Sequence, residues 1–326
     1  MRQRRLGRTG MRVSEIGFGS WAIGGSDWGK QSDRDSADAL NRALNLGCNF
    51  FDTALSYGEG HSEKLIGDAL RKNKALEDVI IATKVPPKNG LWEPPIGQPI
   101  SEAFPSDWII ECCNKSLKNL GRSYIDLLQL HTWNKSWGNE TDWHETLLKL
   151  RDDGKIRAFG ISVSGPRPDE ANAHVTRGMV DTIQVVYNIL NQSAEDVLLP
   201  LAKEHNVGII CRVPLASGGL TGKFTDKTSF ANGDWRRETE DSVWLLSMVK
   251  QVGKVERVIN NSMPLHEAAI KFCLSNPAVS TVIAGARNAK QAELNFGVPS
   301  GDLAPQKLAE LRKMWRSGEI GNLRFP

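Results

Sequence analysis

The chain lacks any long hydrophobic run, and this limits where the protein can reside. None of its 326 residues belongs to a stretch that approaches the roughly 18 apolar residues of a membrane-spanning helix. The arginines at positions 4 and 5 are not followed by the apolar segment of a secretion signal. The net charge is +3, and the basic cluster at residues 2–5 is too small to indicate nucleic-acid binding. We therefore expect a cytoplasmic protein with neither a membrane nor a nucleic acid as its partner.

Cysteine is scarce, and its five positions carry no metal-binding pattern. The cysteines are Cys48, Cys112, Cys113, Cys211 and Cys273. Their number is odd, their spacing is not that of metal ligands, and they lie in apolar strand or helix patterns. We interpret the adjacent Cys112 and Cys113 as small core residues on one helix. The sequence therefore predicts reduced thiols, as in the cytoplasm, and no metal site.

Strand-like and helix-like patterns alternate along the whole chain, and no linker or low-complexity tract interrupts them. Short apolar runs that read as strands recur at 16–19, 49–52, 79–84, 125–131, 158–162, 182–187, 208–213 and 279–283. Strict alternation with helical patterns favours parallel strands joined by right-handed crossovers. A doubly wound sheet is the alternative, but no G-x-G-x-x-G follows the first strand.

The predicted fold class is therefore α/β, a (β/α)8 TIM barrel. The chain length fits a single domain over residues 1–326. We expect an N-terminal β-hairpin over 1–15 and a C-terminal helix over 304–316.

Four polar residues lie at or just beyond the ends of three predicted strands. Asp52 ends the second strand and Tyr57 follows it, Lys84 ends the third, and His131 ends the fourth. The carboxyl ends of barrel strands converge on one mouth, so these side chains should share a pocket. A nearby ammonium lowers the pKa of a tyrosine, a carboxylate pairs with the ammonium, and an imidazole can orient a carbonyl oxygen. The pattern predicts a proton-delivery site with Tyr57 as the acid, although each residue alone has an ordinary structural explanation.

These residues lie in motifs that resemble one family. The segments are NFFDTALSYGEGH at 49–61, Thr83-Lys84, and DLLQLH at 126–131, preceded by an L-G-x-T-G opening at 6–10. They closely resemble the aldo-keto reductase superfamily. The resemblance implies a (β/α)8 barrel, NADPH-linked interconversion of carbonyl and alcohol, and catalytic roles for the Asp, Tyr, Lys and His at these four positions.

A first candidate cofactor site lies near the last predicted barrel helix. Arg287, Gln291 and Asn295 recur every four residues and so share one helix face. The turn before them, which contains Gly285, brings backbone amides near a helix N-terminus that suits an anion. The alternative is that Asn288 and Gln291 form a capping arrangement. The stretch resembles the family's adenosine 2′-phosphate and adenine site, which implies that Arg287 favours NADPH.

The loop at 212–223, RVPLASGGLTGK, is the second candidate cofactor site. Its three glycines let the backbone approach a pyrophosphate. It matches the family's P-L-x-x-G-x-L-T-G-K loop, and the cofactor contacts expected in it are Arg212, Leu215, Ser217, Gly219 and Lys223.

Residues near the ends of the fifth and sixth predicted strands are expected to hold the nicotinamide. Ser162 and Gln184 match positions that bind the carboxamide in relatives. Many members have Ser-Asn where this chain has Ser162-Val163, so one contact is either missing or supplied by Ser164 or Asn188. Tyr187 either stacks beneath the nicotinamide ring or belongs to the core.

Tryptophan is concentrated in or beside the loops expected over the mouth. Of ten tryptophans, six fall there: Trp21, Trp28, Trp92, Trp133, Trp137 and Trp235. Such walls suit flat, partly polar ligands, although the indoles could simply hold the loops together. We expect Trp21, Trp28, Trp92 and Trp133 to contact the substrate. The nearby Asp27, Asn134 and Lys135 favour a sugar-like one.

The sequence thus predicts an enzyme that uses NADPH to reduce the carbonyl group of a small aldehyde or ketone. Two alternatives stay open. One is a nicotinamide-sensing regulatory subunit, because channel-associated members of the superfamily keep the four residues. The other is a redox-neutral epimerase or lyase that uses tightly bound NADP. The oligomeric state and the natural substrate are left undetermined.

Overall fold

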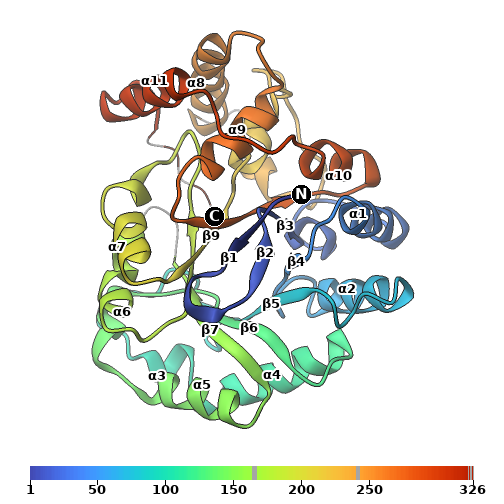
Figure 1. Ribbon diagram of the computed structural model, residues 1–326, viewed down its shortest axis with the longest axis vertical. Helices are drawn as coiled ribbons and strands as arrows, with labels where there is room; N and C mark the ends of the chain where they lie inside the picture. The colour runs from blue at the N-terminus through green and yellow to red at the C-terminus, as the bar shows by residue number, and fades with distance from the viewer. Residues whose placement is uncertain (164–166, 240–242, 322, 324, 326) are drawn as a thin grey trace.

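Eight parallel strands close into a barrel in the computed structural model, which describes residues 1–163, 167–239, 243–321, 323 and 325 (Figure 1). Their order around the barrel is β10-β3-β4-β5-β6-β7-β8-β9. The strands are β3 (Ile16–Gly19), β4 (Phe50–Asp52), β5 (Ile80–Val85), β6 (Ile125–Leu130), β7 (Ile156–Ser162), β8 (Thr182–Val186), β9 (Gly208–Arg212) and β10 (Val279–Gly285).

The helices form an outer ring around this barrel. They are α1 (Asp33–Asn45), α2 (His61–Lys72), α3 (Ile100–Ala103), α4 (Ser106–Leu120), α5 (Asp142–Asp152), α6 (Asn172–Thr176), α7 (Leu198–Glu204), α8 (Val243–Ile259), α9 (Leu265–Leu274), α10 (Ala289–Phe296) and α11 (Pro305–Arg316). The predicted barrel and C-terminal helix are confirmed. Between β7 and β8 the chain forms a 3₁₀ turn, Pro168–Ala171, followed by the short α6.

A β-hairpin closes the amino-terminal end of the barrel, as predicted. β1 (Gln3–Arg5) pairs antiparallel with β2 (Arg12–Ser14), and the hairpin lies across the barrel axis in Figure 1. Leu6, Met11 and Val13 are buried in one cluster with the inward-facing side chains of the strands. Burial of these apolar side chains stabilises the closed end, so the opposite end is left for the site.

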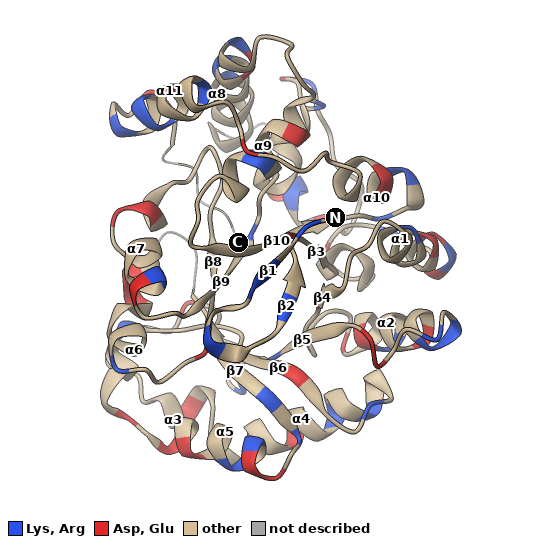
Figure 2. Ribbon diagram, viewed as in Figure 1, with Lys and Arg blue, Asp and Glu red and all other residues tan. Residues whose placement is uncertain are grey.

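The helices around the barrel have buried apolar residues on the side that faces the strands and charged residues on the side that faces solvent. All five cysteines are buried and free, and Cys112 and Cys113 lie together on α4 as predicted. Figure 2 shows both signs of charge interspersed along the outer helices. In the described part of the chain, no helix combines the length and the apolar character needed to cross a membrane.

Candidate active site

The barrel register brings the predicted catalytic side chains to one end. Asp52 is the last residue of β4 and pairs with Ala82 of β5. Lys84 lies two residues further along β5, and His131 directly follows β6. Tyr57 is carried by the turn between β4 and α2. Four side chains from three neighbouring strand ends therefore converge.

The ammonium of Lys84 is the centre of this group. Its side chain has no solvent exposure, and Nζ donates to Asp52 Oδ1 at 2.6 Å and to the Thr53 carbonyl at 2.7 Å. The third contact of Nζ is the Tyr57 hydroxyl oxygen, at 3.4 Å. Asp52 is itself held, because its Oδ2 accepts from Gln184 at 2.7 Å. Although burial disfavours the ammonium, Asp52 and Tyr57 raise the pKa of Lys84, which keeps it charged.

The phenol and the imidazole lie side by side next to Lys84. The Tyr57 hydroxyl oxygen is 3.5 Å from His131 Nε2. Burial raises the pKa of the Tyr57 phenol, and the Lys84 ammonium opposes that rise. Burial also lowers the pKa of His131 well below its ordinary value, and the positive charge of Lys84 lowers it further. The imidazole is therefore neutral at pH 7, with one N–H to donate.

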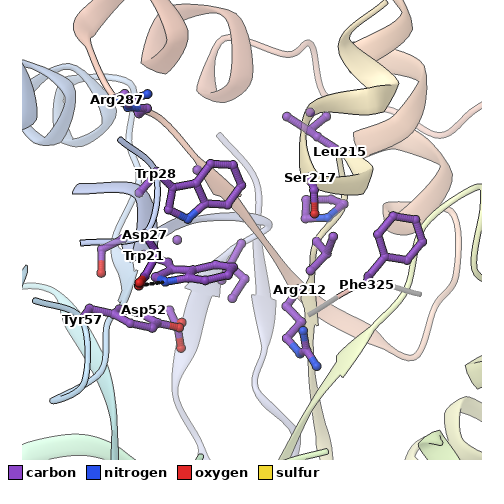
Figure 3. Close-up of a pocket in the computed structure, with 18 of the residues that line it drawn as sticks. Trp21, Asp27, Trp28, Asp52, Tyr57, Arg212, Leu215, Ser217, Arg287 and Phe325 are labelled. Carbon is purple, nitrogen blue, oxygen red and sulfur yellow. Dashed lines mark hydrogen bonds between the residues drawn. The ribbon is translucent and has the colours of Figure 1, made fainter. Parts of the chain in front are cut away.

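A cavity of about 930 Å³ opens beside these residues at the carboxyl end of the barrel. Asp52, Tyr57 and His131 line it, and Lys84 lies behind them. Figure 3 shows Tyr57 and Asp52 on one side of the cavity and Arg212 across from them. The predicted cofactor residues that line it are Ser162, Gln184, Arg212, Leu215, Ser217, Lys223, Gly285, Arg287, Gln291 and Asn295.

The turn before α10 is stiffened by its own side chains. Asn288 Oδ1 accepts from the amide of Gln291 at 2.9 Å, and Gln291 Oε1 accepts from the amide of Arg287 at 2.9 Å. Asn295 Nδ2 donates to the Gly285 carbonyl at 2.8 Å. The capping arrangement is thus present, yet Arg287, Gln291 and Asn295 also face the cavity.

Two loops from either side of β10 join across its carboxyl end. They are residues 24–32 after β3 and residues 228–237 after β9, which we call the clasp. The Gly29 amide donates to the Gly233 carbonyl at 3.0 Å, and the Trp235 amide donates to the Asp27 carbonyl at 2.9 Å. Because β10 lies between β3 and β9, the clasp spans the end of the cavity that holds Gly285.

Comparison with known proteins agrees with this geometry. The model of the Aldo/keto reductase family matches residues 15–316. The chain belongs to that family. It is therefore an oxidoreductase, and aldo-keto reductases use nicotinamide cofactors.

Similar proteins align with nearly the whole of this aldo-keto reductase. Aldo-keto reductase YhdN of Bacillus subtilis (strain 168) is 32% identical over 291 residues, which are 87% of this chain and 85% of the relative. The NADH-specific methylglyoxal reductase of Escherichia coli (strain K12) is 29% identical over 327 residues, 96% of this chain and 98% of the relative. The holo form of aldo-keto reductase AKR11C1 from Bacillus halodurans superposes with a TM-score of 0.76 at 28% identity, covering 96% of each chain.

Three of the predicted contact residues do not line the cavity. The Tyr187 side chain is fully buried against Phe272, and its hydroxyl donates to Glu195, so it belongs to the core and not to the cavity. Gly219 faces Met248, with which an added Cβ would collide, and it does not line the cavity. Trp133 is 1% exposed and packs edge-on against Trp137, Trp143 and His174. It therefore packs among these rings and does not line the cavity.

The other candidate substrate and carboxamide contacts differ in whether they line the cavity. Trp21, Trp28 and Trp92 do line the cavity. Asn188 does not, because its side-chain amide donates to the Val213 carbonyl and its oxygen accepts from the Leu190 amide. Ser164 lies outside the described residues.

Several cavity residues escaped the sequence analysis. Arg236 of the clasp pairs with Asp234 at 2.6 Å and lies over the ring of Trp28 at 4.5 Å. Ser56 lies 3.3 Å from His131 through its Oγ, and Phe325 reaches the cavity from the chain terminus. The sequence could have indicated Ser56, because it directly precedes Tyr57. Arg236 and Phe325 lie on segments distant in sequence, and no local sequence pattern shows that these segments reach the cavity.

We predict that replacing Lys84 with Met raises the pKa of Tyr57 further, because the ammonium that stabilises the phenolate is lost. Absorbance titration of tyrosinate can measure this, since the chain has only three tyrosines. The Tyr57→Phe variant assigns the transition by deleting it. A Tyr57 transition that stays in place in Lys84→Met would show that Lys84 serves only Asp52.

Proposed function

We propose that this aldo-keto reductase uses NADPH to reduce the carbonyl group of a small aldehyde or ketone, with Tyr57 as the general acid. The observation that carries the proposal is the contact of the buried Lys84 ammonium with both the Asp52 carboxylate and the Tyr57 hydroxyl oxygen. A phenol at its ordinary pKa is a poor acid at pH 7, and burial raises the pKa of Tyr57 further; the adjoining Lys84 ammonium opposes that rise by stabilising the phenolate.

Each residue of the group has a distinct part in this chemistry. A bound nicotinamide cofactor supplies the hydride that adds to the carbonyl carbon. Tyr57 gives its hydroxyl proton to the carbonyl oxygen, and Lys84 stabilises the phenolate that results. His131 donates a hydrogen bond to the same oxygen and orients it. Asp52 keeps Lys84 charged and in place.

The donor set of the cavity fits a dinucleotide with several negative charges. Arg212, Lys223, Arg236 and Arg287 all line it. The loop at 216–222 bends sharply, with Ser217 and Gly218 at φ values of 54° and 100°, so its backbone can lie close to a pyrophosphate. We assign this arm of the cavity to the cofactor and the arm beside Trp21 and Trp92 to the substrate.

Arg287 supports the choice of NADPH over NADH. Its Nε donates to Gln31 Oε1 at 2.8 Å and its Nη2 to the Lys30 carbonyl at 2.6 Å. Within the described part of the chain, Nη1 has no hydrogen-bond partner, so it can bind a 2′-phosphate. The guanidinium is thus both oriented by the clasp and able to read the phosphate.

The substrate arm combines aromatic faces with polar groups. Trp21 and Trp92 flank Tyr57 and His131, with ring centres 6.2 Å from Tyr57 and 4.9 Å from His131 respectively. Asp27, Glu59 and Glu93 also line this arm. Indole faces beside carboxylates suit sugar-like or aromatic carbonyl compounds, which is the substrate class we favour.

Replacement of Tyr57 with Phe is expected to remove the acid and keep the shape of the cavity. Carbonyl reduction should fall by at least about 10²-fold, the usual contribution of a general acid. NADPH binding, measured by fluorescence titration, should stay within a few-fold of wild type. Tyr124→Phe is the matched control, because that hydroxyl donates to the exposed Glu77 and does not line the cavity. Full reduction by Tyr57→Phe would overturn the assignment.

Replacement of Arg287 with Ala is expected to weaken NADPH binding by roughly ten- to a hundredfold, the loss of one charge-assisted contact. NADH binding should barely change. Gln31→Ala is the informative control, because it removes a clasp contact that orients Arg287 and keeps the charge; its loss of NADPH affinity should be smaller than that of Arg287→Ala. Equal losses for both cofactors in Arg287→Ala would mean that Arg287 supports the clasp and does not read the phosphate.

The clasp also favours a second function, a redox-neutral epimerase or lyase in which the cofactor is never released. Its loops span the cofactor arm, and Arg236 donates to the Ser217 carbonyl at 3.1 Å, which ties the clasp to the loop at 216–222. We predict that a redox-neutral enzyme would retain NADP through gel filtration and show its absorbance at one equivalent per chain. An NADPH-dependent carbonyl reductase would lose the cofactor during gel filtration and would require added NADPH for each turnover.

A further inference from the structure

The basic cluster near the start of the chain contributes to a second pocket, at the closed end of the barrel. This pocket has a volume of about 480 Å³, and Arg2, Arg4, Arg5 and Lys203 line it. The basic residues of β1 lie near the centre of the view in Figure 2, where the hairpin covers the barrel. Residues of β1, α7, the end of α9 and the start of β10 meet in its wall, so only the folded chain forms the pocket.

Two of these four cations have a clear part in the fold. Arg4 donates to the carbonyl that ends α9 at 2.8 Å and to the carbonyl that begins β10 at 3.0 Å. Arg2 Nε donates to Glu15 at 3.0 Å, and Arg4 Nε lies 3.8 Å from the same carboxylate. Arg2 also lies 3.9 Å from Asp302, which lines the pocket. Arg2 and Arg4 therefore tie the hairpin to the barrel, and two carboxylates oppose their charges.

Arg5 and Lys203 have no such part in the fold. Both residues are exposed, and neither side chain forms a hydrogen bond or an ion pair with any residue that the structure describes. Because Glu15 and Asp302 oppose only two of the four positive charges, two charges remain in excess. Like charges gathered in one pocket repel one another, and an anion bound among them removes that cost. A phosphate monoester, with about −1.5 to −2 charges at pH 7, matches the excess.

A β-bulge places a hydroxyl group in the wall of the same pocket. Val279 and Thr281 of β10 are partners of two successive residues of β9, so Ser280 is the extra residue between them. Bulges re-aim side chains and are frequent at barrel rims and next to active sites. Ser280 is only 5% exposed and lines the pocket, and its hydroxyl forms no hydrogen bond with a described residue. It can therefore donate to a ligand oxygen.

We propose that this pocket binds the phosphate group of a small phosphorylated compound, at a site separate from the candidate active site. Arg5 and Lys203 supply the uncompensated charge, and the Ser280 hydroxyl donates a hydrogen bond to a phosphate oxygen. The volume lies in the range of small-molecule sites and leaves room for an organic part beside the phosphate. Asn206 and Asp302 in the wall can form hydrogen bonds with hydroxyl groups of that part.

Isothermal titration calorimetry of the full chain at constant ionic strength tests the proposal, with inorganic phosphate and glycerol 3-phosphate as the two probes. A slight molar excess of NADPH keeps the cofactor arm occupied, so the titration measures binding elsewhere. We expect one equivalent of probe to bind with a Kd below about 1 mM, and glycerol without phosphate not to bind. Tighter binding of glycerol 3-phosphate would identify an organic phosphate as the ligand, and equal affinities would identify the free ion. Phosphate binding that occurs only without NADPH would lie in the cofactor arm and would overturn the proposal.

A double variant, Arg5→Gln with Lys203→Gln, removes the excess charge and keeps the two cations that the fold uses. Its affinity for either probe should fall at least about tenfold, the loss of one charge-assisted contact, while carbonyl reduction stays at the wild-type rate. Ser280→Ala should lower the affinity by a few-fold. Lys72→Gln with Lys118→Gln is the matched control, because it changes the net charge equally at exposed sites of α2 and α4 that do not line the pocket. An unchanged affinity in the double variant, or an equal loss in the control, would show that the probes bind elsewhere or respond only to net charge, and would overturn the proposal.

Discussion

The buried ion pair between Lys84 and Asp52 is the interaction on which the candidate site depends. An ammonium without solvent exposure is costly unless its charge is compensated and its hydrogens are bonded. Asp52 compensates the charge, and the Thr53 carbonyl and the Tyr57 oxygen take the other two hydrogens. The pair thereby directs one N–H at the phenol and makes Tyr57 the group whose acidity it controls.

The barrel supplies the geometry that this pair requires. Asp52 and Lys84 lie on adjacent strands, so their separation is set by strand register and not by flexible loops. The hairpin closes the opposite end with apolar side chains. The clasp and the tryptophan-bearing loops then enclose the open end, where water would otherwise weaken the electrostatic interactions.

Trp133 and Tyr187 lie outside the cavity for one physical reason. Trp133 and Tyr187 both follow strands, as functional residues of a barrel do, and both are large aromatics. Whether such a side chain faces the cavity or the packed layer behind it depends on the loop that covers it. For Trp133 that layer is Trp143 and His174, and for Tyr187 it is Phe272 with Glu195, all contributed by segments distant in sequence or by later turns.

The sequence by itself determined the barrel and the placement of Asp52, Tyr57, Lys84 and His131 at strand ends, because strand ends and the period of apolar residues are local signals. The tertiary structure alone decided which loops meet. Arg236 lines the cavity, Gln31 orients Arg287, and Ser56 contacts His131 only because separate connections dock over the mouth. Such contacts join residues far apart along the chain, and no spacing within one segment encodes them.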